Sequence, residues 1–241
     1  MKNQLIEYLK FDSQFFKLNI SKLKKNFLKK NHLTSIIKFC KKENIHLLQF
    51  KCDSSNSESI DNAEKLGFKF VDTRIILKKI INKKYTVKKN STRLRLAKKS
   101  DITKLKSFAD NMFVESRYYY DKQFPKIKLN EFYNDWIRKG ILSEFDDYVL
   151  LLTEESKIIG ICTIKSTKDI ATIGLFGIKK SYRKKNYGSI FLKKINNKLF
   201  DNNIKIINVI TQGRNYSAIS LYQKHNFLIE KIEIYYHKWF S

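Results

Sequence analysis

A short basic segment is the part of this chain whose residue types most clearly indicate chemistry. Five of the seven residues from Lys179 to Lys185 are basic, and they lie between an apolar segment ending at Ile178 and a helical pattern beginning at Tyr187. The free N–H groups and the dipole at a helix N-terminus favour an anion, and basic side chains around the turn strengthen such a site for a pyrophosphate. A solvated basic turn is the alternative reading in so lysine-rich a chain. The segment predicts a site for a phosphate-bearing ligand.

The overall charge is a weaker guide to function than its size suggests. The 241 residues carry 49 Lys and Arg against 23 Asp and Glu, a formal net charge of +26. The first 90 residues and the remainder each carry +13, and Lys outnumbers Arg 42 to 7. A nucleic-acid-binding protein would more often concentrate its charge and use Arg to read bases. We therefore favour A/T-rich codon usage as the origin of the charge.

Several other classes of protein find no support. Apolar runs are far shorter than the ~20 residues of a membrane span, and Glu7 and Asp12 interrupt the start of the chain, so we expect a soluble, cytoplasmic protein without a signal peptide. Cys40, Cys52 and Cys162 are widely spaced, as reduced thiols would be. There is no P-loop, G-x-G-x-x-G, H-E-x-x-H or G-x-S-x-G string. The four histidines lack ligand spacing, so no metal is expected and surface or hydrogen-bonded roles are favoured for His32, His46, His225 and His237.

The sequence predicts helices and strands on both sides of the basic segment, and these elements could position it. The polar stretch Asn82–Ser91 is the best domain boundary and follows a strand pattern over Thr73–Ile81. Beyond it, hydrophobic periodicity predicts strands and helices in the order β-α-α-β-β-β-α-β-α-β, which implies an α+β sheet with helices on its faces. The expected helices are Asp101–Ser116 (with Asp101 as N-cap), Lys128–Lys139, Tyr187–Phe200 and Tyr216–His225. The expected strands are Thr92–Ala97, Asp147–Leu152, Lys157–Ser166, Ile170–Ile178, Ile204–Thr211 and Phe227–Trp239.

The chain also contains an internal similarity. Asn44–Lys79 aligns with Asn203–Lys238 without a gap, and both segments follow the pattern strand, loop, helix, Gly or Asn, Phe, long strand. Chance matching in a biased composition is the alternative. We favour a repeat in which the N-terminal copy is truncated and inactive, because it has Ala63 where the later copy has Tyr222.

The basic segment resembles the acyl-CoA-binding motif of the GNAT superfamily of N-acetyltransferases, R/Q-x-x-G-x-G/A after a strand. The motif stands here as Arg183-Lys184-Lys185-Asn186-Tyr187-Gly188 within Ala171–Leu192. Asn186 takes the first glycine position, and Asn tolerates positive φ better than other non-Gly residues. The resemblance implies acetyl-CoA as the acyl donor. It assigns donor binding to Leu175, Phe176, Gly177, Ile178, Arg183, Lys184, Lys185, Asn186, Tyr187, Gly188, Ser189 and Asn215.

A second segment, Thr211–Phe227, resembles the N-x-x-A-x-x-L-Y-x-x-x-G-F sequence of the same superfamily. Asn215, Tyr222 and Phe227 match, and Asn226 replaces the usual Gly. Asn215 and Tyr222 are seven residues apart, two helical turns along one face. The resemblance implies that Asn215 contacts the cofactor and that Tyr222 protonates the departing thiolate, which a phenol can do as charge develops on sulfur. An ordinary core tyrosine is the alternative.

A third resemblance concerns the acceptor. Leu94–Asp101, Ser116–Trp136 and the closing Tyr236–Trp239, with a looser match at Phe11–Leu23, are similar to acetyltransferases that act on dTDP-4-amino-sugars of the TDP-fucosamine type. An Arg and stacked tyrosines suit a nucleotide diphosphate and its base, although these tyrosines could equally pack in the core. The acceptor-site candidates are Glu115, Arg117, Tyr118, Tyr119, Tyr120 and Asp121.

Together these patterns predict an α+β GNAT fold with a mixed, mostly antiparallel sheet and flanking helices. A catalytic domain over residues 89–241 follows a smaller α/β domain over residues 1–88 that resembles a degenerate half-GNAT. We expect direct attack of an amine on acetyl-CoA, with a backbone N–H near Phe176–Ile178 holding the oxyanion and a water chain, Glu115 or Asp121 as base. A nucleotide-linked amino sugar is the favoured acceptor, and a homodimer is compatible with the sequence. The alternatives are another amine (a protein N-terminus, a polyamine or a different sugar amine) and a non-catalytic nucleic-acid-binding protein.

Overall fold

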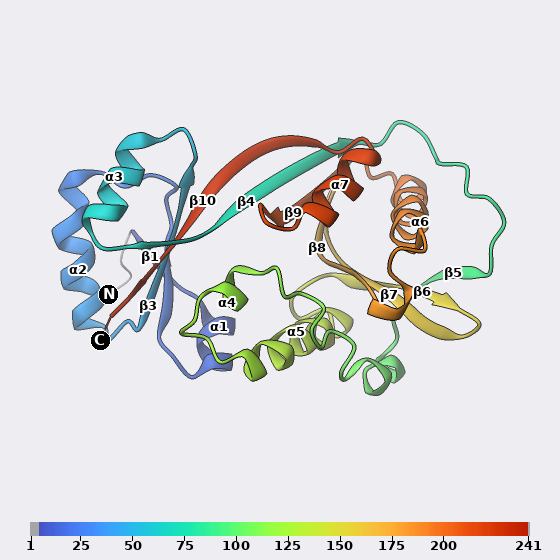
Figure 1. The fold of residues 1–241 in the computed structure, drawn as a ribbon, viewed down its shortest axis with the longest axis horizontal. Coiled ribbons are helices and arrows are strands. Elements are labelled where there is room, and N and C mark those ends of the chain that lie inside the picture. The colour runs from blue at the N-terminus through green and yellow to red at the C-terminus, as the bar shows by residue number, and fades with distance from the viewer. Residues whose placement is uncertain (1–4, 241) are drawn as a thin grey trace. The chain divides into compact units, whose positions relative to one another are not determined.

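The computed structural model describes residues 5–240, which divide into two compact units (Figure 1). The first unit contains the described residues up to Ile75, together with Gln212–Arg214 and the residues from Lys231 on. The second contains Ile76–Thr211 and Asn215–Glu230. Two long strands, β4 (Lys69–Ile80) and β10 (Leu228–Trp239), contribute residues to both units. Among the residues from 5 to 240, no helix is long and apolar enough to cross a membrane.

The first unit packs the helices over Leu33–Lys42 and Ser57–Lys65 on one face of a sheet with strand order β1-β2-β3-β10-β4. Alternate residues of β3 (Leu48, Phe50 and Cys52) are buried with Ile36 and Ala63 in one hydrophobic cluster, as the period-2 pattern of a strand requires. The strands completed within this unit are β1 (Ile6–Tyr8), β2 (Ile20–Leu23) and β3 (Leu47–Asp53). Its helices are α1 (Lys10–Phe16), the 3₁₀ turn Lys30–His32, α2 (Leu33–Lys42) and α3 (Ser57–Lys65).

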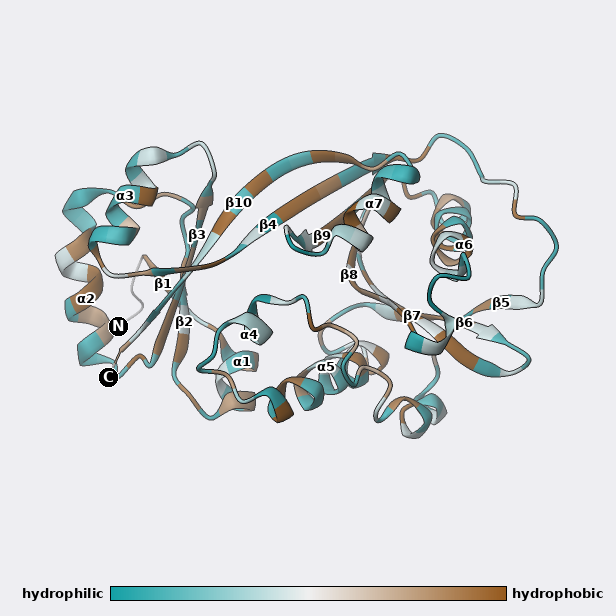
Figure 2. Cartoon of the chain, in the orientation of Figure 1, coloured by the Kyte–Doolittle hydropathy of each residue, from teal (hydrophilic) through white to brown (hydrophobic). Residues whose placement is uncertain are grey.

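The second unit builds a sheet with the order β10-β4-β9-β8-β7-β6-β5, in which β5 to β8 are antiparallel and β8 runs parallel to β9. Its own strands are β5 (Thr92–Leu96), β6 (Tyr148–Glu154), β7 (Lys157–Thr167), β8 (Ile170–Ile178) and β9 (Ile206–Gln212). Its α-helices are α4 (Arg117–Tyr120), α5 (Lys126–Ile141), α6 (Tyr187–Asp201) and α7 (Tyr216–Lys224). Figure 2 shows hydrophobic stretches along the strands and alternating colours around α6. The expected α+β sheet with helices on its faces is confirmed.

The internal repeat predicted from the sequence is confirmed at the level of secondary structure. Adding 159 to the bounds of β3, α3 and β4 gives the bounds of β9, α7 and β10. Asn56 and Asn215 both cap their helices, accepting hydrogen bonds from the N–H groups of Ser59 (3.0 Å) and Ala218 (3.2 Å). Gly67 and Asn226 end the two helices with φ of 73° and 63°. Asn226 is therefore in the left-handed conformation for which Gly and Asn are suited.

The two copies exchange their last strands. The last strand of the later copy, β10, pairs antiparallel with β3 of the earlier copy, and the sheet order places β4 beside β9. The order β3-β10-β4-β9 is thus unchanged when the copies are swapped. Arg74 and Glu233 occupy equivalent repeat positions and form an ion pair with each other, and the Glu233 carboxylate also contacts Lys51 and Lys231 at 3.4 and 3.5 Å. Because β4 and β10 contribute residues to both compact units, the limits of these units differ from the domain boundary predicted at residues 88/89. The division into two domains stays a prediction.

The prediction of an α-helix over Asp101–Ser116 is wrong. The segment contains two 3₁₀ turns, Lys99–Asp101 and Thr103–Leu105, and then turns up to Ser116. The Asp101 carboxylate does not cap an α-helix. It accepts hydrogen bonds from two guanidinium nitrogens of Arg95 at 2.7 and 2.8 Å, and these bonds lower the pKa of Asp101 to about 2. The amides of Ala109 and Asn111 donate to side chains of α5 instead of to helical carbonyls. Tertiary hydrogen bonds have replaced the local ones that periodicity assumed.

The other expected elements of the second unit are confirmed, with their ends shifted by a few residues. The helix expected over Lys128–Lys139 is α5, Lys126–Ile141, and the strand expected over Ile204–Thr211 is β9, Ile206–Gln212. The strand Ile170–Ile178 is observed with the bounds that were predicted.

Candidate active site

The sheet of the second unit opens at one point. Strands β8 and β9 are paired only from Ile170/Ile206 to Ile173/Val209, although β8 continues to Ile178. Because N–H and C=O groups alternate between the two edges of a strand, every second residue of β8 beyond Ile173 turns its backbone groups towards the missing partner. Such free groups on a buried strand can bind amide and carbonyl groups of a ligand. The opening lies directly before the basic segment.

A β-bulge in β8 begins at this opening. Thr163 of β7 faces two residues of β8, Gly174 and Leu175, because the pairing shifts by one residue between Ile164/Ile173 and Cys162/Phe176. The amide of Leu175, displaced from the regular ladder, donates to the Thr163 hydroxyl at 2.9 Å. The bulge redirects β8 where it leaves β9, as bulges beside functional sites commonly do.

The basic segment forms a tight loop into α6. After the 3₁₀ turn Lys180–Tyr182, Lys184 and Asn186 have φ of 60° and 64°, and α6 then begins at Tyr187. The positive φ at Asn186 agrees with its place at a glycine position of the motif. The N–H groups of the first turn of α6 have no intrahelical partner, and Lys184, Lys185 and Asn186 are exposed beside them. This concave turn of amides, with basic side chains around it, fits a pyrophosphate.

The remaining donor-site candidates hold this loop in place. Arg183 donates from Nε to the carbonyl of Ile178 at 2.9 Å and from Nη2 to that of Met112 at 3.5 Å. Tyr187 donates to Glu154 at 2.6 Å. A Cβ at Gly188 would lie 3.4 Å from Leu221, an ordinary contact distance, so Gly188 lies against α7. Gly177 and Leu175 are buried, Phe176 stacks on Phe191 with centroids 5.2 Å apart, and Asn215 is the half-buried cap of α7.

Ser189 forms a contact that the sequence reasoning missed. Its hydroxyl lies 2.5 Å from Nε2 of His225, and both side chains are buried. This contact joins the first turn of α6 to the end of α7, and Tyr85 packs edge-on against the imidazole. Burial, together with nearby lysines, lowers the pKa of His225 to about 4. His225 is therefore a hydrogen-bonded histidine, one of the two roles the sequence favoured, but no residue spacing signalled its partner.

Tyr222 lies on the α7 side of the opening. It is 3% exposed, and its ring packs against Phe176 and Phe227 with centroids 6.1 and 5.5 Å away. Among the described residues, none forms a hydrogen bond with its hydroxyl. Burial raises the pKa of Tyr222, so the phenol stays protonated at neutral pH. The position can serve either as a core aromatic or as a protonated acid beside the opening.

The six acceptor candidates form a compact cluster, but most of their polar atoms bind one another or α5. Tyr118 is buried between Phe124 and Phe132, with the Arg117 guanidinium 4.2 Å above its ring. Tyr119 donates to Asn130 at 2.5 Å, and Tyr120, which is exposed, donates to Glu115 at 3.1 Å. Asp121 is buried and accepts from the amide of Gln123. Their role towards an acceptor stays a prediction.

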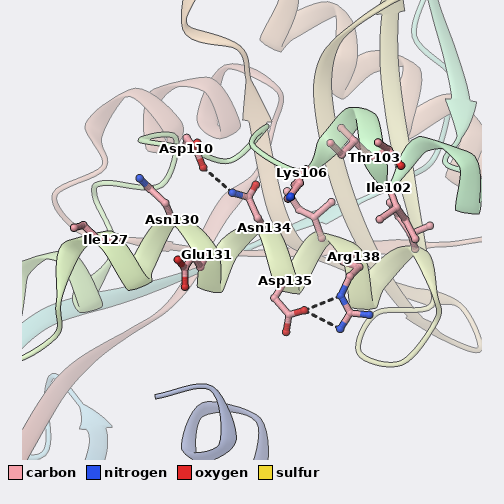
Figure 3. Close-up of a pocket in the computed structure, with 13 residues that line it drawn as sticks. Ile102, Thr103, Lys106, Asp110, Ile127, Asn130, Glu131, Asn134, Asp135 and Arg138 are labelled. Atoms are coloured by element: carbon pink, nitrogen blue, oxygen red, sulfur yellow. Dashed lines mark hydrogen bonds and ion pairs between the residues drawn. The ribbon is translucent and has the colours of Figure 1, made fainter. Parts of the chain in front are cut away.

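A groove of about 740 Å³ runs beside α5, outside these six candidates (Figure 3). Apolar residues of α5 and of the 3₁₀ turns, including Ile102, Leu105 and Ile137, form much of its lining. In Figure 3 the Asp135 carboxylate of α5 pairs with Arg138, and Asn134 donates to Asp110. Within residues 5–240 no group of three or more His, Cys, Asp and Glu side chains could hold a metal ion.

The fold of this chain is the GNAT fold. A GCN5-related N-acetyltransferase from Sphaerobacter thermophilus, 11% identical, has a TM-score of 0.68 over 97% of this chain and 76% of its own. A conserved protein of unknown function from Staphylococcus epidermidis, 14% identical, has the same TM-score over 100% of this chain and 93% of its own.

Sequence comparison adds the family. Residues 110–227 match the acetyltransferase (GNAT) family, so this chain carries a GNAT acetyltransferase domain, for which acetyl-CoA is the family's co-substrate. A spore coat polysaccharide biosynthesis protein of Bacillus subtilis, SpsD, is 24% identical over 139 residues. That alignment covers 58% of this chain and 48% of SpsD, so the chain spans about half the length of the curated relative it matches.

The buried His225 predicts a pH dependence of stability. Its folded-state pKa of about 4 lies below the 6.5 of an unperturbed imidazole, so the unfolded state binds more protons between these values. The contribution of His225 to stability is therefore complete above pH 6.5 and falls as the pH drops towards 4. Urea unfolding between pH 7.5 and 4.5 would show a smaller loss of stability on acidification in His225→Gln than in the unsubstituted protein. Equal losses in the two proteins would contradict the assignment.

Proposed function

We propose that this protein transfers the acetyl group of acetyl-CoA to a primary amine of a nucleotide-linked amino sugar. The observation that carries acetyl transfer is the opening of β8 from β9, which lies between the loop into α6 on one side and Tyr222 on the other. The family domain supports the reaction class. The amino-sugar acceptor is supported by the similarity to SpsD and by the aromatic cluster at residues 117–120.

The residues around the loop fit acetyl-CoA. Lys184 and Asn186 adopt the positive φ that curves the backbone, and the amides of the first turn of α6 supply donors for a pyrophosphate. Free backbone groups of β8 beyond Ile173 suit the amides of the pantetheine arm. The Asn215 carbonyl oxygen already caps α7, which leaves its amide nitrogen for the cofactor.

In the proposed reaction the neutral amine attacks the thioester carbonyl while both substrates are bound. A backbone N–H of β8 near Phe176–Ile178 donates to the developing oxyanion. Tyr222 then gives its proton to the sulfur. The raised pKa keeps the phenol protonated at neutral pH, so Tyr222 has a proton to give as charge develops on sulfur during C–S cleavage.

The test of the proposed function is release of CoA thiol from acetyl-CoA across a panel of amines. We expect release with nucleotide-linked 4-amino sugars and much slower release with polyamines or peptides. Release with polyamines or peptides alone would retain the acetyltransferase and discard the sugar. No release with any amine, and no acetyl-CoA binding in calorimetry, would overturn the proposal.

Tyr222→Phe tests the acid. Phenylalanine keeps the packing against Phe176 and Phe227, so we expect unchanged acetyl-CoA affinity and a kcat about 10² to 10⁴ times lower. Tyr236→Phe is the matched control, since Tyr236 is also buried but lies in the first unit with its hydroxyl 3.4 Å from Glu64. Full activity of Tyr222→Phe would remove Tyr222 from the mechanism.

Gly188 tests the loop into α6. A Cβ there would make ordinary contact with Leu221 at 3.4 Å, whereas a larger side chain would push the first turn of α6 away. We expect Gly188→Leu to raise the KM for acetyl-CoA at least tenfold while Gly188→Ala changes it little. Steady-state kinetics at saturating acceptor measure both. Equal KM values in the Leu and Ala variants would argue against pyrophosphate binding at this turn.

A further inference from the structure

The carboxylate of Asp146 is buried without a cation. It lies before β6, is 5% exposed, and accepts a hydrogen bond at Oδ2 from Nε1 of Trp136 at 2.7 Å. Among the described residues no Lys, Arg or His forms an ion pair with Asp146, and no group donates to Oδ1. A buried carboxylate is costly unless paired, so an unmatched one favours a cationic ligand.

Asp146 lies against the bulge of β8. A Cβ at Gly174 would be 3.3 Å from Asp146 Oδ1 and 2.8 Å from the Thr163 hydroxyl. Gly174 itself is exposed, and it is the first residue of β8 beyond the last pair with β9. The free oxygen of Asp146 is therefore next to the strand segment at which the sheet opens.

Asp146 and Tyr222 approach β8 from opposite faces. Partnered residues of antiparallel strands share a face, and successive residues alternate. Phe176 and its partner Cys162 share the face on which Tyr222 packs. Thr163 faces the other way, with the bulge residues and Asp146. A group held at the opening would have the carboxylate on one side and the phenol on the other.

We propose that Asp146 binds the ammonium group of the acceptor and takes its proton; this rests on the proposed acetyl transfer. The ammonium group gives one proton to the Asp146 carboxylate, which passes it to water. The freed nitrogen lone pair forms the C–N bond to the acetyl carbon, and the C–S bond breaks with its electron pair leaving on sulfur. Sulfur takes a proton from Tyr222, and the second proton lost by nitrogen restores the phenol.

The ionisable groups facing Asp146 are few. On the opposite face of β7, the thiol of Cys162 has a raised pKa, caused by burial and then by the Asp146 charge. On α5 the neutral Trp136 is the hydrogen-bonding partner, while Arg138 and Lys139 pair with Asp135. In its own loop, Asp147 accepts from the amide and hydroxyl of Ser166, and burial raises the pKa of Tyr148. An acceptor ammonium group would supply the missing positive charge.

The deciding experiment compares Asp146→Asn with Asp147→Asn, a neighbouring exposed carboxylate as control. We expect Asp146→Asn to bind acetyl-CoA normally and to lose about 10² to 10⁴-fold in kcat/KM for the amine at pH 7. The deficit should shrink as the pH rises towards the pKa of the amine, because more acceptor is then neutral in solution. Asp147→Asn should match the unsubstituted enzyme at every pH.

Trp136→Phe keeps the carboxylate and removes its donor, so it guards against a folding failure of Asp146→Asn. We expect a lower kcat with an unchanged KM for acetyl-CoA and an unchanged melting temperature within a few degrees. The role of Asp146 would be overturned, without affecting the proposed function, by either of two results. One is activity of Asp146→Asn within twofold of the unsubstituted enzyme, and the other is a loss of kcat/KM that does not change with pH. Absence of acetyl transfer in the unsubstituted enzyme would instead overturn the proposed function, and this inference with it.

Discussion

The arrangement of the candidate site depends on the place at which β8 separates from β9. The two strands are paired for only four residues, from Ile170/Ile206 to Ile173/Val209. Beyond this point the edge of β8 has no strand partner, and its backbone groups can form hydrogen bonds with a ligand. The bulge at Gly174 and Leu175, with the Thr163 hydroxyl as replacement acceptor, stabilises the point of divergence. The loop into α6, the ring of Tyr222 and the carboxylate of Asp146 are all arranged around this opening.

The repeat explains which parts of this arrangement are general and which are specific. Both copies have an Asn cap and a left-handed residue at the end of the helix, because both must connect a strand to a short helix and then to a long strand. The cap role of Asn215 is therefore structural whatever else it binds. Tyr222 has no counterpart, since the buried Ala63 stands at its position. Because β4 and β10 are exchanged, the last strand of each copy lies beside the first strand of the other copy. Arg74 of β4 and Glu233 of β10 form an ion pair.

Two sets of polar contacts in the second unit hold the elements around the site. The Ser189–His225 contact joins α6 to α7 below the loop, and Arg183 binds the carbonyls of Ile178 and Met112 with its guanidinium. A buried hydrogen bond such as the one between Ser189 and His225 fixes the relative positions of its two helices, because breaking it leaves an unsatisfied group. Asp146 is different: one of its oxygens is held by Trp136, and the other is without a donor among the described residues.

From the sequence alone we could predict the repeat, the order of strands and helices from β6 onwards, and residues suited to the αL conformation at Asn186 and Asn226. These follow from local periodicity and from the backbone preferences of single residues, which act over a few positions. The prediction failed over Asp101–Ser116, where Arg95, Asn130 and Asn134 supply hydrogen bonds from elsewhere in the chain. Four features became visible only in the three-dimensional fold: the separation of β8 from β9, the pairing of Ser189 with His225, the burial of Asp146 beside Gly174 and the exchange of β4 and β10. Each of these depends on residues far apart in sequence, and no local pattern records which distant groups will meet.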